Sequence, residues 1–253
     1  MLRLIPIYLG LAIIGVIQFY AERRNRDIAA EQASIRQQIL AERASIEVLS
    51  DQLNTVGRDD NDPQRQARNL LRQMRQIGSG FIVILGDSIT ERAQLPASLC
   101  GSPLINAGIG GSRTSNFIPL VEQMGQFSPR LIVVALGIND TSRTLNTDFA
   151  SLYNVLLDSL PRVSLMLVGL TPVDYSGVVG SRLDPDKVKA VDAFIRSSAK
   201  ARELPFVDMN MPNFTTLDGV HLTVGSYARW NKALLAGIKK SLNCNDEREG
   251  ATK

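Results

Sequence analysis

The stretch FIVILGDSITER, residues 81–92, decides the fold. Five apolar residues lead directly into Gly86, Asp87 and Ser88, and a polar segment of helical character follows. A short apolar run that ends at a glycine is typical of a buried strand. In a parallel α/β sheet ligands bind at the carboxyl ends of the strands, where the N–H groups of the next helix point toward them. The pattern therefore places Ser88 where a nucleophile would stand, although Asp87 and Ser88 are also favoured helix caps.

The rest of the chain alternates strand and helix patterns. Strands are expected at 81–85, 104–107, 131–136, 164–170 and 205–207, and helices at 116–123, 148–160, 187–202 and 224–242. Nearly continuous apolar strands that alternate with helices are typical of a parallel sheet covered on both faces. Because crossovers are right-handed, the strands all end at one edge of the sheet. We therefore predict an α/β fold with its chemistry at that edge.

Four loops at the predicted edge contain residues suited to one kind of chemistry. Ser88 follows the first strand, and Asn139 follows the third. The second loop, NAGIGG at 106–111, has glycines that let backbone N–H groups approach a ligand closely. Asp218 lies three residues before His221, the only histidine of the chain. Each residue could be a cap, a turn or a surface residue, but together they are the parts of an acyl-transfer site.

These motifs resemble those of the SGNH, or GDSL, hydrolases. The matching segments are GDSI at 86–89, the glycine loop, GIND at 137–140 and DGVH at 218–221. NAGIGG and DGVHLT are most similar to members related to platelet-activating-factor acetylhydrolase and to carbohydrate acetylesterases. The resemblance spans about residues 80–243 and implies a three-layer α/β/α, flavodoxin-like sheet. The motif Gly-x-Ser-x-Gly is absent around Ser88, which argues against an α/β-hydrolase.

The resemblance also implies a role for each site residue. The expected triad is Ser88 as nucleophile, His221 as general base and then acid, and Asp218 as the group that orients the imidazole. The expected oxyanion hole consists of the Ser88 N–H, the Gly111 N–H and the Asn139 side-chain amide. Gly110 is an alternative to Gly111, because two adjacent glycines leave the register open. A neutral imidazole suits this chemistry, because its pKa lies near working pH.

Composition narrows the choice of partners and cofactors. The 253 residues have a formal charge of +3, but the lysines and arginines are scattered, so nucleic-acid binding has little support. The two cysteines, Cys100 and Cys244, are too few and too far apart for a metal site. No ligand spacing suggests a metal, and the expected mechanism needs no cofactor. The cysteines could pair if the domain is exported to an oxidising compartment.

Residues 1–21 are predicted to form a transmembrane anchor. Residues 4–20 are apolar and contain no charge, which is the short end of what can span a bilayer. A cleaved signal peptide is the alternative, but the run ends in QFYAERR without a small-x-small pattern. Arginines lie on both sides of the run and mildly favour a cytoplasmic C-terminal side, although long translocated domains often disregard that rule. We expect the catalytic domain on the extracytoplasmic, periplasmic side, with the orientation open.

The segment between the anchor and the catalytic domain is predicted to be helical. Residues 22–77 would form a stalk or coiled coil with a hinge near 57–63, where the sequence is GRDDNDP. A single amphipathic helix lying on its own domain is the alternative, and a coiled coil would allow a homo-oligomer. Residues 78–243 would form the hydrolase domain and 244–253 a polar tail.

Together these features predict a membrane-anchored serine esterase that hydrolyses small acyl esters, acetyl above all, on a cell-envelope glycan. Its partners would be an acyl-ester substrate, such as an acetylated glycan or a lipid, and the membrane. The alternatives are a lysophospholipase or thioesterase for longer acyl chains, an acyltransferase to a sugar, and a non-catalytic envelope scaffold. Substrate choice is expected to depend on loops such as residues 171–185.

Overall fold

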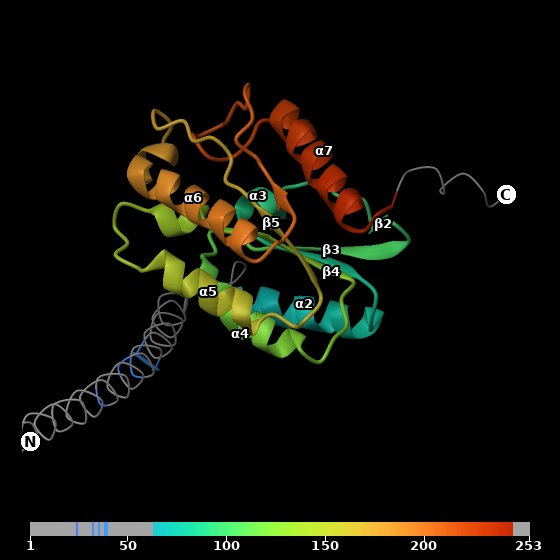
Figure 1. Cartoon of the computed structure of the whole chain (residues 1–253). Coiled ribbons are helices and arrows are strands. Elements are labelled where there is room, and N and C mark those ends of the chain that lie inside the picture. The colour runs from blue at the N-terminus through green and yellow to red at the C-terminus, as the bar shows by residue number, and fades with distance from the viewer. Residues whose placement is uncertain (1–23, 25–31, 33–34, 36–37, 40–62, 245–253) are drawn as a thin grey trace, which may run out of the picture. The chain divides into compact units, whose positions relative to one another are not determined.

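The structure, a computed structural model, describes residues 24, 32, 35, 38–39 and 63–244 (Figure 1). The chain divides into a unit over Met1–Ile46 and a unit over Glu47–Lys253. In the first unit, the described residues are helical and exposed. None of the described helices is long and apolar enough to cross a membrane. The predicted anchor lies outside the described residues, as do most of the predicted stalk, its hinge and the polar tail.

The second unit is built on a six-stranded sheet in the order β2-β3-β1-β4-β5-β6. Its strands are β1 (Ile82–Gly86), β2 (Ser98–Leu99), β3 (Ser102–Gly108), β4 (Leu131–Ala135), β5 (Ser164–Val168) and β6 (Phe206–Val207). The five predicted strands are confirmed and pair in parallel. The sheet is mainly parallel, and only the short edge strand β2, which was not predicted, pairs antiparallel with β3. Without β2, the order is the flavodoxin-like 2-1-3-4-5.

Helices cover both faces of this sheet, which confirms the three-layer prediction (Figure 1). They are α2 (Pro63–Ile77), α3 (Ser88–Glu91), α4 (Thr114–Met124), α5 (Phe149–Ser159), α6 (Pro185–Ala201) and α7 (Val224–Ser241), with 3-10 turns η1 (Ile138–Thr141) and η2 (Gly180–Arg182). Helix α4 packs against α2 and α5, and α5 contacts α6. Helix α7 packs on β5 and β6 from the opposite face.

Strand β1 forms the centre of the core. Its apolar residues are completely buried, because β3 and β4 flank it and helices cover both faces. This burial explains why the run shows no alternation of polar and apolar residues. Connections leave β1 and β4 in opposite directions, so their carboxyl ends form the topological switch point of the sheet. That point is where a ligand site is expected in an open α/β sheet.

Two glycines bring helix α3 directly onto the ends of the strands. A Cβ atom on Gly86 would lie 2.0 Å from the Oγ1 of Thr90, and one on Gly108 would lie 2.1 Å from the backbone nitrogen of Glu91. Real side-chain carbons do not approach other atoms so closely, so only glycine fits at either position. The glycines of β1 and β3 therefore fix the depth at which α3 sits on the sheet.

A disulfide joins Cys100, in the turn between β2 and β3, to Cys244, which follows α7. The Cα atoms lie 5.9 Å apart, within the usual range, and 144 residues separate the two cysteines. The structure thus pairs the two cysteines that the sequence left open. The bond ties the end of the last helix to the edge of the sheet.

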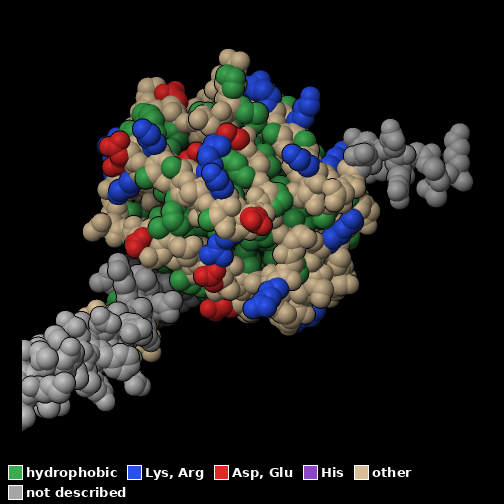
Figure 2. Space-filling view, viewed as in Figure 1, with side chains coloured by type: hydrophobic (Ala, Val, Ile, Leu, Met, Phe, Trp, Pro, Cys, Tyr) green, Lys and Arg blue, Asp and Glu red, His purple; other side chains and the backbone are tan. Residues whose placement is uncertain are grey.

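Surface charges of the second unit are mixed in sign. On the face shown in Figure 2, Lys and Arg side chains are interspersed with Asp and Glu. The surface charges of the second unit include the ion pairs Arg196–Asp208 at 2.9 Å and Arg202–Asp158 at 2.8 Å. Exposed pairs of this kind add little stability, roughly 0 to 1 kcal/mol each.

Candidate active site

Helix α3 places Ser88 at the carboxyl end of β1. Asp87 is its N-cap, and its carboxylate accepts a hydrogen bond from the Ile89 N–H at 2.9 Å. Ser88 is the first residue of the helix, so its N–H belongs to the donors that have no acceptor within the helix. The side chain is nearly buried, with 8% of the residue exposed. Both explanations offered by the sequence hold, because Asp87 caps the helix and Ser88 stands at the switch point.

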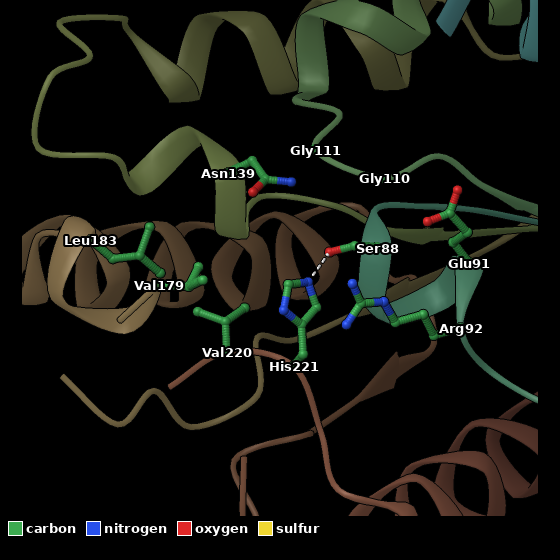
Figure 3. Close-up of a pocket in the computed structure, with 10 residues that line it drawn as sticks. All are labelled: Ser88, Glu91, Arg92, Gly110, Gly111, Asn139, Val179, Leu183, Val220 and His221. Carbon is green, nitrogen blue, oxygen red and sulfur yellow. Dashed lines mark hydrogen bonds between the residues drawn. The ribbon is translucent and has the colours of Figure 1, made fainter. Parts of the chain in front are cut away.

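His221 lies between Ser88 and Asp218. Its Nε2 atom is 2.9 Å from the Ser88 Oγ, and its Nδ1 atom is 2.6 Å from the Asp218 Oδ2 (Figure 3). The other carboxylate oxygen of Asp218 accepts the backbone N–H groups of His221 and Val220, at 2.9 and 3.1 Å. The structure thus brings the three predicted triad residues into one hydrogen-bonded chain.

Those hydrogen bonds control the charge of Asp218. Partial burial acts to raise the pKa of this carboxyl group, but the hydrogen bonds from the His221 side chain and from the two N–H groups outweigh it. The pKa of Asp218 is therefore lower than its ordinary value. A carboxylate that stays ionised keeps the Nδ1–H of His221 directed toward it and leaves Nε2 free to accept the serine proton.

The loop of residues 171–185 supports the backbone of Asp218. Its Val179 and Gly180 N–H groups both donate to the Asp218 carbonyl oxygen, at 2.8 and 3.1 Å. The contact is between two backbones, since a Cβ atom on Gly177 would lie 2.3 Å from the carbonyl carbon of Asp218. The loop expected only to affect substrate choice is therefore also a support for the triad.

Asn139 and the glycine loop form the opposite side of the site. Asn139 belongs to η1, directly after β4, and its Nδ2 donates to the Ser112 carbonyl oxygen at 2.9 Å. An amide nitrogen has two hydrogens, so one remains for a ligand. Gly111 has a φ of +73°, which glycine adopts without strain. Gly111 and Asn139 line the same cleft as Ser88.

A buried contact joins the loops after β3 and β4. The Oδ2 of Asp140 accepts the Thr114 N–H at 3.1 Å and the Thr114 hydroxyl at 3.0 Å. Both residues are almost fully buried. This contact fixes the loop after β3, which contains Gly111, relative to the loop after β4, which contains Asn139. The two predicted oxyanion donors are therefore held in place by a buried hydrogen-bonded pair.

The site opens into a cleft of about 340 Å³. Its walls are lined by Ser88, Glu91, Arg92, Gly110, Gly111, Asn139, Val179, Leu183, Val220 and His221 (Figure 3). Among the residues that the structure describes, no group of three His, Cys, Asp or Glu side chains could hold a metal ion. Of the predicted site residues, Ser88, Gly111, Asn139 and His221 line this cleft, as does Gly110, whereas Asp218 lies behind His221 and does not.

Asp87 is a buried acid next to the nucleophile. Only 3% of it is exposed, and burial raises its pKa to about 7, against the opposing hydrogen bond from the Ile89 N–H. The negative charges of Asp140 and Glu91 raise the pKa further. Near neutral pH this carboxyl group is therefore divided between its charged and neutral forms.

Sequence reasoning missed five residues of the cleft. Glu91 and Arg92 lie two and three residues after the end of the GDSI motif, and the motif was the available indication of their position. The other three are Val179, Leu183 and Val220, two of which belong to the 171–185 loop. Their inward position depends on the contact of that loop with Asp218, which no local pattern reveals.

Solved structures share this fold. A lipase/acylhydrolase from Enterococcus faecalis is 20% identical, with 64% of this chain and 96% of that chain covered and a TM-score of 0.54. A GDSL-like lipase from Bacteroides thetaiotaomicron is 21% identical, with 70% and 97% covered and a TM-score of 0.52. A carbohydrate acetylesterase family member from Sinorhizobium meliloti is 17% identical, with 65% and 99% covered and a TM-score of 0.53. At these identities the likeness shows the fold.

The assignment of the chain to a family rests on its sequence. No curated protein is similar enough to the chain to count as a match. The model of the GDSL-like lipase/acylhydrolase family matches residues 84–229, more than half of the chain. The matched segment begins within β1 and ends within α7, so it contains the hydrogen-bonded chain of Ser88, His221 and Asp218. The chain therefore belongs to the GDSL-like lipase/acylhydrolase family and is an ester-hydrolysing enzyme.

Proposed function

We propose that this enzyme hydrolyses esters of small acyl groups, acetyl above all, on a cell-envelope glycan, through a Ser-His-Asp triad. The observation that carries the proposal is the pair of hydrogen bonds that His221 makes, 2.9 Å to Ser88 and 2.6 Å to Asp218. Ser88 would be the nucleophile, His221 the general base and Asp218 its orienting group.

The proposed reaction has two steps. His221 Nε2 takes the hydroxyl proton as the Ser88 Oγ attacks the ester carbonyl, and the oxyanion meets the N–H groups of Ser88 and Gly111 and the Asn139 amide. His221 then gives the proton to the leaving alcohol, which leaves an acyl group on Ser88. Water, deprotonated by the same imidazole, hydrolyses that acyl-enzyme. Each donor that is well aimed at the oxyanion could supply roughly 3 to 4 kcal/mol.

The cleft supports a small acyl group. Its volume of about 340 Å³ must hold both the acyl group and part of the alcohol. A larger apolar hollow of about 580 Å³ lies beside α6, but none of its lining residues lines the cleft. A long acyl chain bound at Ser88 would therefore not occupy that hollow without rearrangement, and the small-acyl hypothesis is preferred to a lysophospholipase or thioesterase.

The proposed place of action is the outer side of a membrane. Residues 1–21 would anchor the chain and residues 22–77 would hold the catalytic domain away from the bilayer. The disulfide between Cys100 and Cys244 supports export, because such bonds persist in oxidising compartments. Alkaline phosphatase is active only outside the cytoplasm, so a fusion of this reporter to the C-terminus should be active. An inactive alkaline phosphatase fusion, together with an active fusion to a reporter that works only in the cytoplasm, would show that the catalytic domain lies on the cytoplasmic side.

The function is tested with p-nitrophenyl esters of increasing acyl length. We expect kcat/KM to be highest for acetate and to fall steeply toward decanoate, and we expect Ser88→Ala to remove the activity. A fluorophosphonate probe should label the native chain at Ser88 and leave that variant unlabelled. A maximum at long chains would favour the lipase alternative, and full activity of Ser88→Ala would refute the assignment of the nucleophile.

A further inference from the structure

The cleft has two unlike walls. Val179, Leu183 and Val220 form an apolar wall, whereas Glu91 and Arg92 form a charged wall. Figure 3 shows the two walls on opposite sides of the pair formed by His221 and Ser88. An ester bound at Ser88 would therefore extend its acyl group and its alcohol into different surroundings. The apolar wall suits the acyl group, which leaves the alcohol beside the charged wall.

Arg92 is placed by the same short helix that places the nucleophile. It is the C-cap of α3, and its backbone N–H donates to the Ser88 carbonyl oxygen at 3.2 Å. In Figure 3 its guanidinium group points toward His221 and Ser88. Within the described part of the chain, this group has neither an ion-pair nor a hydrogen-bond partner. An unpaired guanidinium beside the reacting atoms is a strong and geometrically selective binder of carboxylate or phosphate.

Glu91 does not neutralise this cation. Its carboxylate lies against Gly110, since a Cβ atom on that glycine would be 2.7 Å from the Oε2. In Figure 3 it points away from Ser88 and His221, and it forms no ion pair with Arg92. Along the charged wall, the guanidinium of Arg92 therefore lies close to the position of the ester, and the carboxylate of Glu91 lies farther from it. A ligand that fits this order has an anionic group near the ester and hydrogen-bond donors beyond it.

We propose that the alcohol part of the natural ester carries an anionic group, a carboxylate or a phosphate, that Arg92 binds during hydrolysis. Hydroxyl groups farther along the alcohol would donate to Glu91, so the substrate class is an acylated acidic sugar or a similar polyhydroxy anion. The inference rests on the proposed function, in which Ser88 cleaves a small acyl ester. To that function it adds two statements, that Arg92 determines specificity and that the leaving alcohol is negatively charged.

The experiment uses three aryl acetates that share the acetyl group and the phenyl ring and carry a different substituent, anionic or neutral, on the alcohol. They are 3-acetoxybenzoate, its neutral methyl ester and 3-acetoxyphenyl phosphate, each corrected for its rate of hydrolysis by hydroxide alone. The measured quantity is the ratio of kcat/KM for an anionic ester to kcat/KM for the neutral ester. We expect the full chain to prefer the anionic esters, and the carboxylate and phosphate arms show which anion Arg92 accepts better.

The variants separate Arg92 from general effects of charge. Arg92→Gln should lower the anionic-to-neutral ratio about tenfold or more, mainly through KM, because a hydrogen bond to a charged group is lost. Arg92→Lys should retain part of the preference, since the charge remains without the planar fork. Arg162→Gln is the matched control, because Arg162 is an exposed arginine just before β5, at the opposite edge of the sheet. It should change neither ratio.

The outcomes distinguish the two proposals. If the full chain hydrolyses none of the three acetates, the proposed small-acyl function is wrong, and the substrate class falls with it. If the neutral ester is hydrolysed but the ratio is the same in Arg92→Gln as in the full chain, only the role of Arg92 is refuted. A preference of the full chain for the neutral ester would refute it as well. Circular dichroism confirms that each variant is folded.

Discussion

The Nε2 atom of His221 lies 2.9 Å from the Oγ of Ser88, although 133 residues separate the two along the chain. Each residue reaches this point from a different side. Ser88 is delivered by β1 and the short helix α3, whereas His221 belongs to the turn that precedes α7. The contact is short enough for direct proton transfer in either step of acyl transfer. Its alignment depends on the partner at the far side of the imidazole.

Replacing Asp218 with Asn should therefore remove most of the activity and leave the fold intact. The amide would no longer hold the Nδ1–H tautomer of His221, so Nε2 would lose its role as proton acceptor. We expect kcat for p-nitrophenyl acetate to fall on the order of 10³- to 10⁴-fold, with little change in KM. Asp186→Asn is the matched control, since Asp186 is exposed at the start of α6. A loss of less than tenfold in Asp218→Asn would show that another group orients His221.

Gly177→Ala should impair catalysis from outside the cleft. The new methyl group would meet the carbonyl carbon of Asp218 at 2.3 Å, so either the 171–185 loop or the Asp218 turn must move. We expect kcat to fall at least tenfold and the free energy of unfolding to fall by about 1 to 3 kcal/mol. Gly225→Ala, at a position with no neighbour within 4 Å, should leave kcat unchanged. Unaltered kinetics in Gly177→Ala would contradict the role of the loop as a support.

Asp87 should make the stability of the native protein depend on pH. Its pKa is about 7 in the folded state and 3.8 as a reference, so the folded state holds the proton more tightly. Raising the pH from about 4 to about 7 therefore favours unfolding, because the unfolded chain releases that proton first. The shift corresponds to a loss of up to about 4 kcal/mol across this window.

Urea unfolding of the native protein and Asp87→Asn at pH 5 and pH 8 measures this effect. Asparagine can still accept the Ile89 N–H but does not titrate, so the variant lacks the Asp87 contribution. We expect the native protein to lose more stability than the variant between the two pH values. Parallel losses in both proteins would mean that Asp87 remains charged when buried.

Breaking the disulfide should destabilise the protein without altering its site. The bond closes a loop of 144 residues, and constraining the unfolded chain to this extent stabilises a protein by about 3 to 5 kcal/mol. Cys100→Ser and Cys244→Ser should each lower Tm equally, and the double variant should lower it no further. Thermal denaturation with and without a reducing agent checks this, since reduction should affect only the native protein. An additive double variant would contradict the pairing.

Local sequence patterns predicted the sheet, and together with the resemblance to the GDSL hydrolases they predicted the triad, because both depend on short segments. The run at 81–85 predicted a buried strand, and such a strand would place Ser88 at the edge of the sheet. The edge strand Ser98–Leu99 could not be predicted, because two residues show no periodicity. The positions of the Arg92 and Val179 side chains in the cleft could not be predicted from the sequence either. Arg92 turns toward His221 only once α3 is seated on Gly86 and Gly108, and Val179 faces the cleft only through a backbone contact with Asp218.

That backbone contact has a consequence for how enzymes of this design change over evolution. Val179 lines the cleft with its side chain, while its N–H holds the carbonyl of Asp218. Side chains that line the cleft, such as that of Val179, can change without moving this backbone contact, and each such change alters what the cleft admits. Insertions or deletions between Gly177 and Gly180 would instead shift the catalytic acid. New substrate ranges should therefore arise here by point substitution, and a loop transplanted from a relative should bring its specificity only if the glycine spacing is preserved.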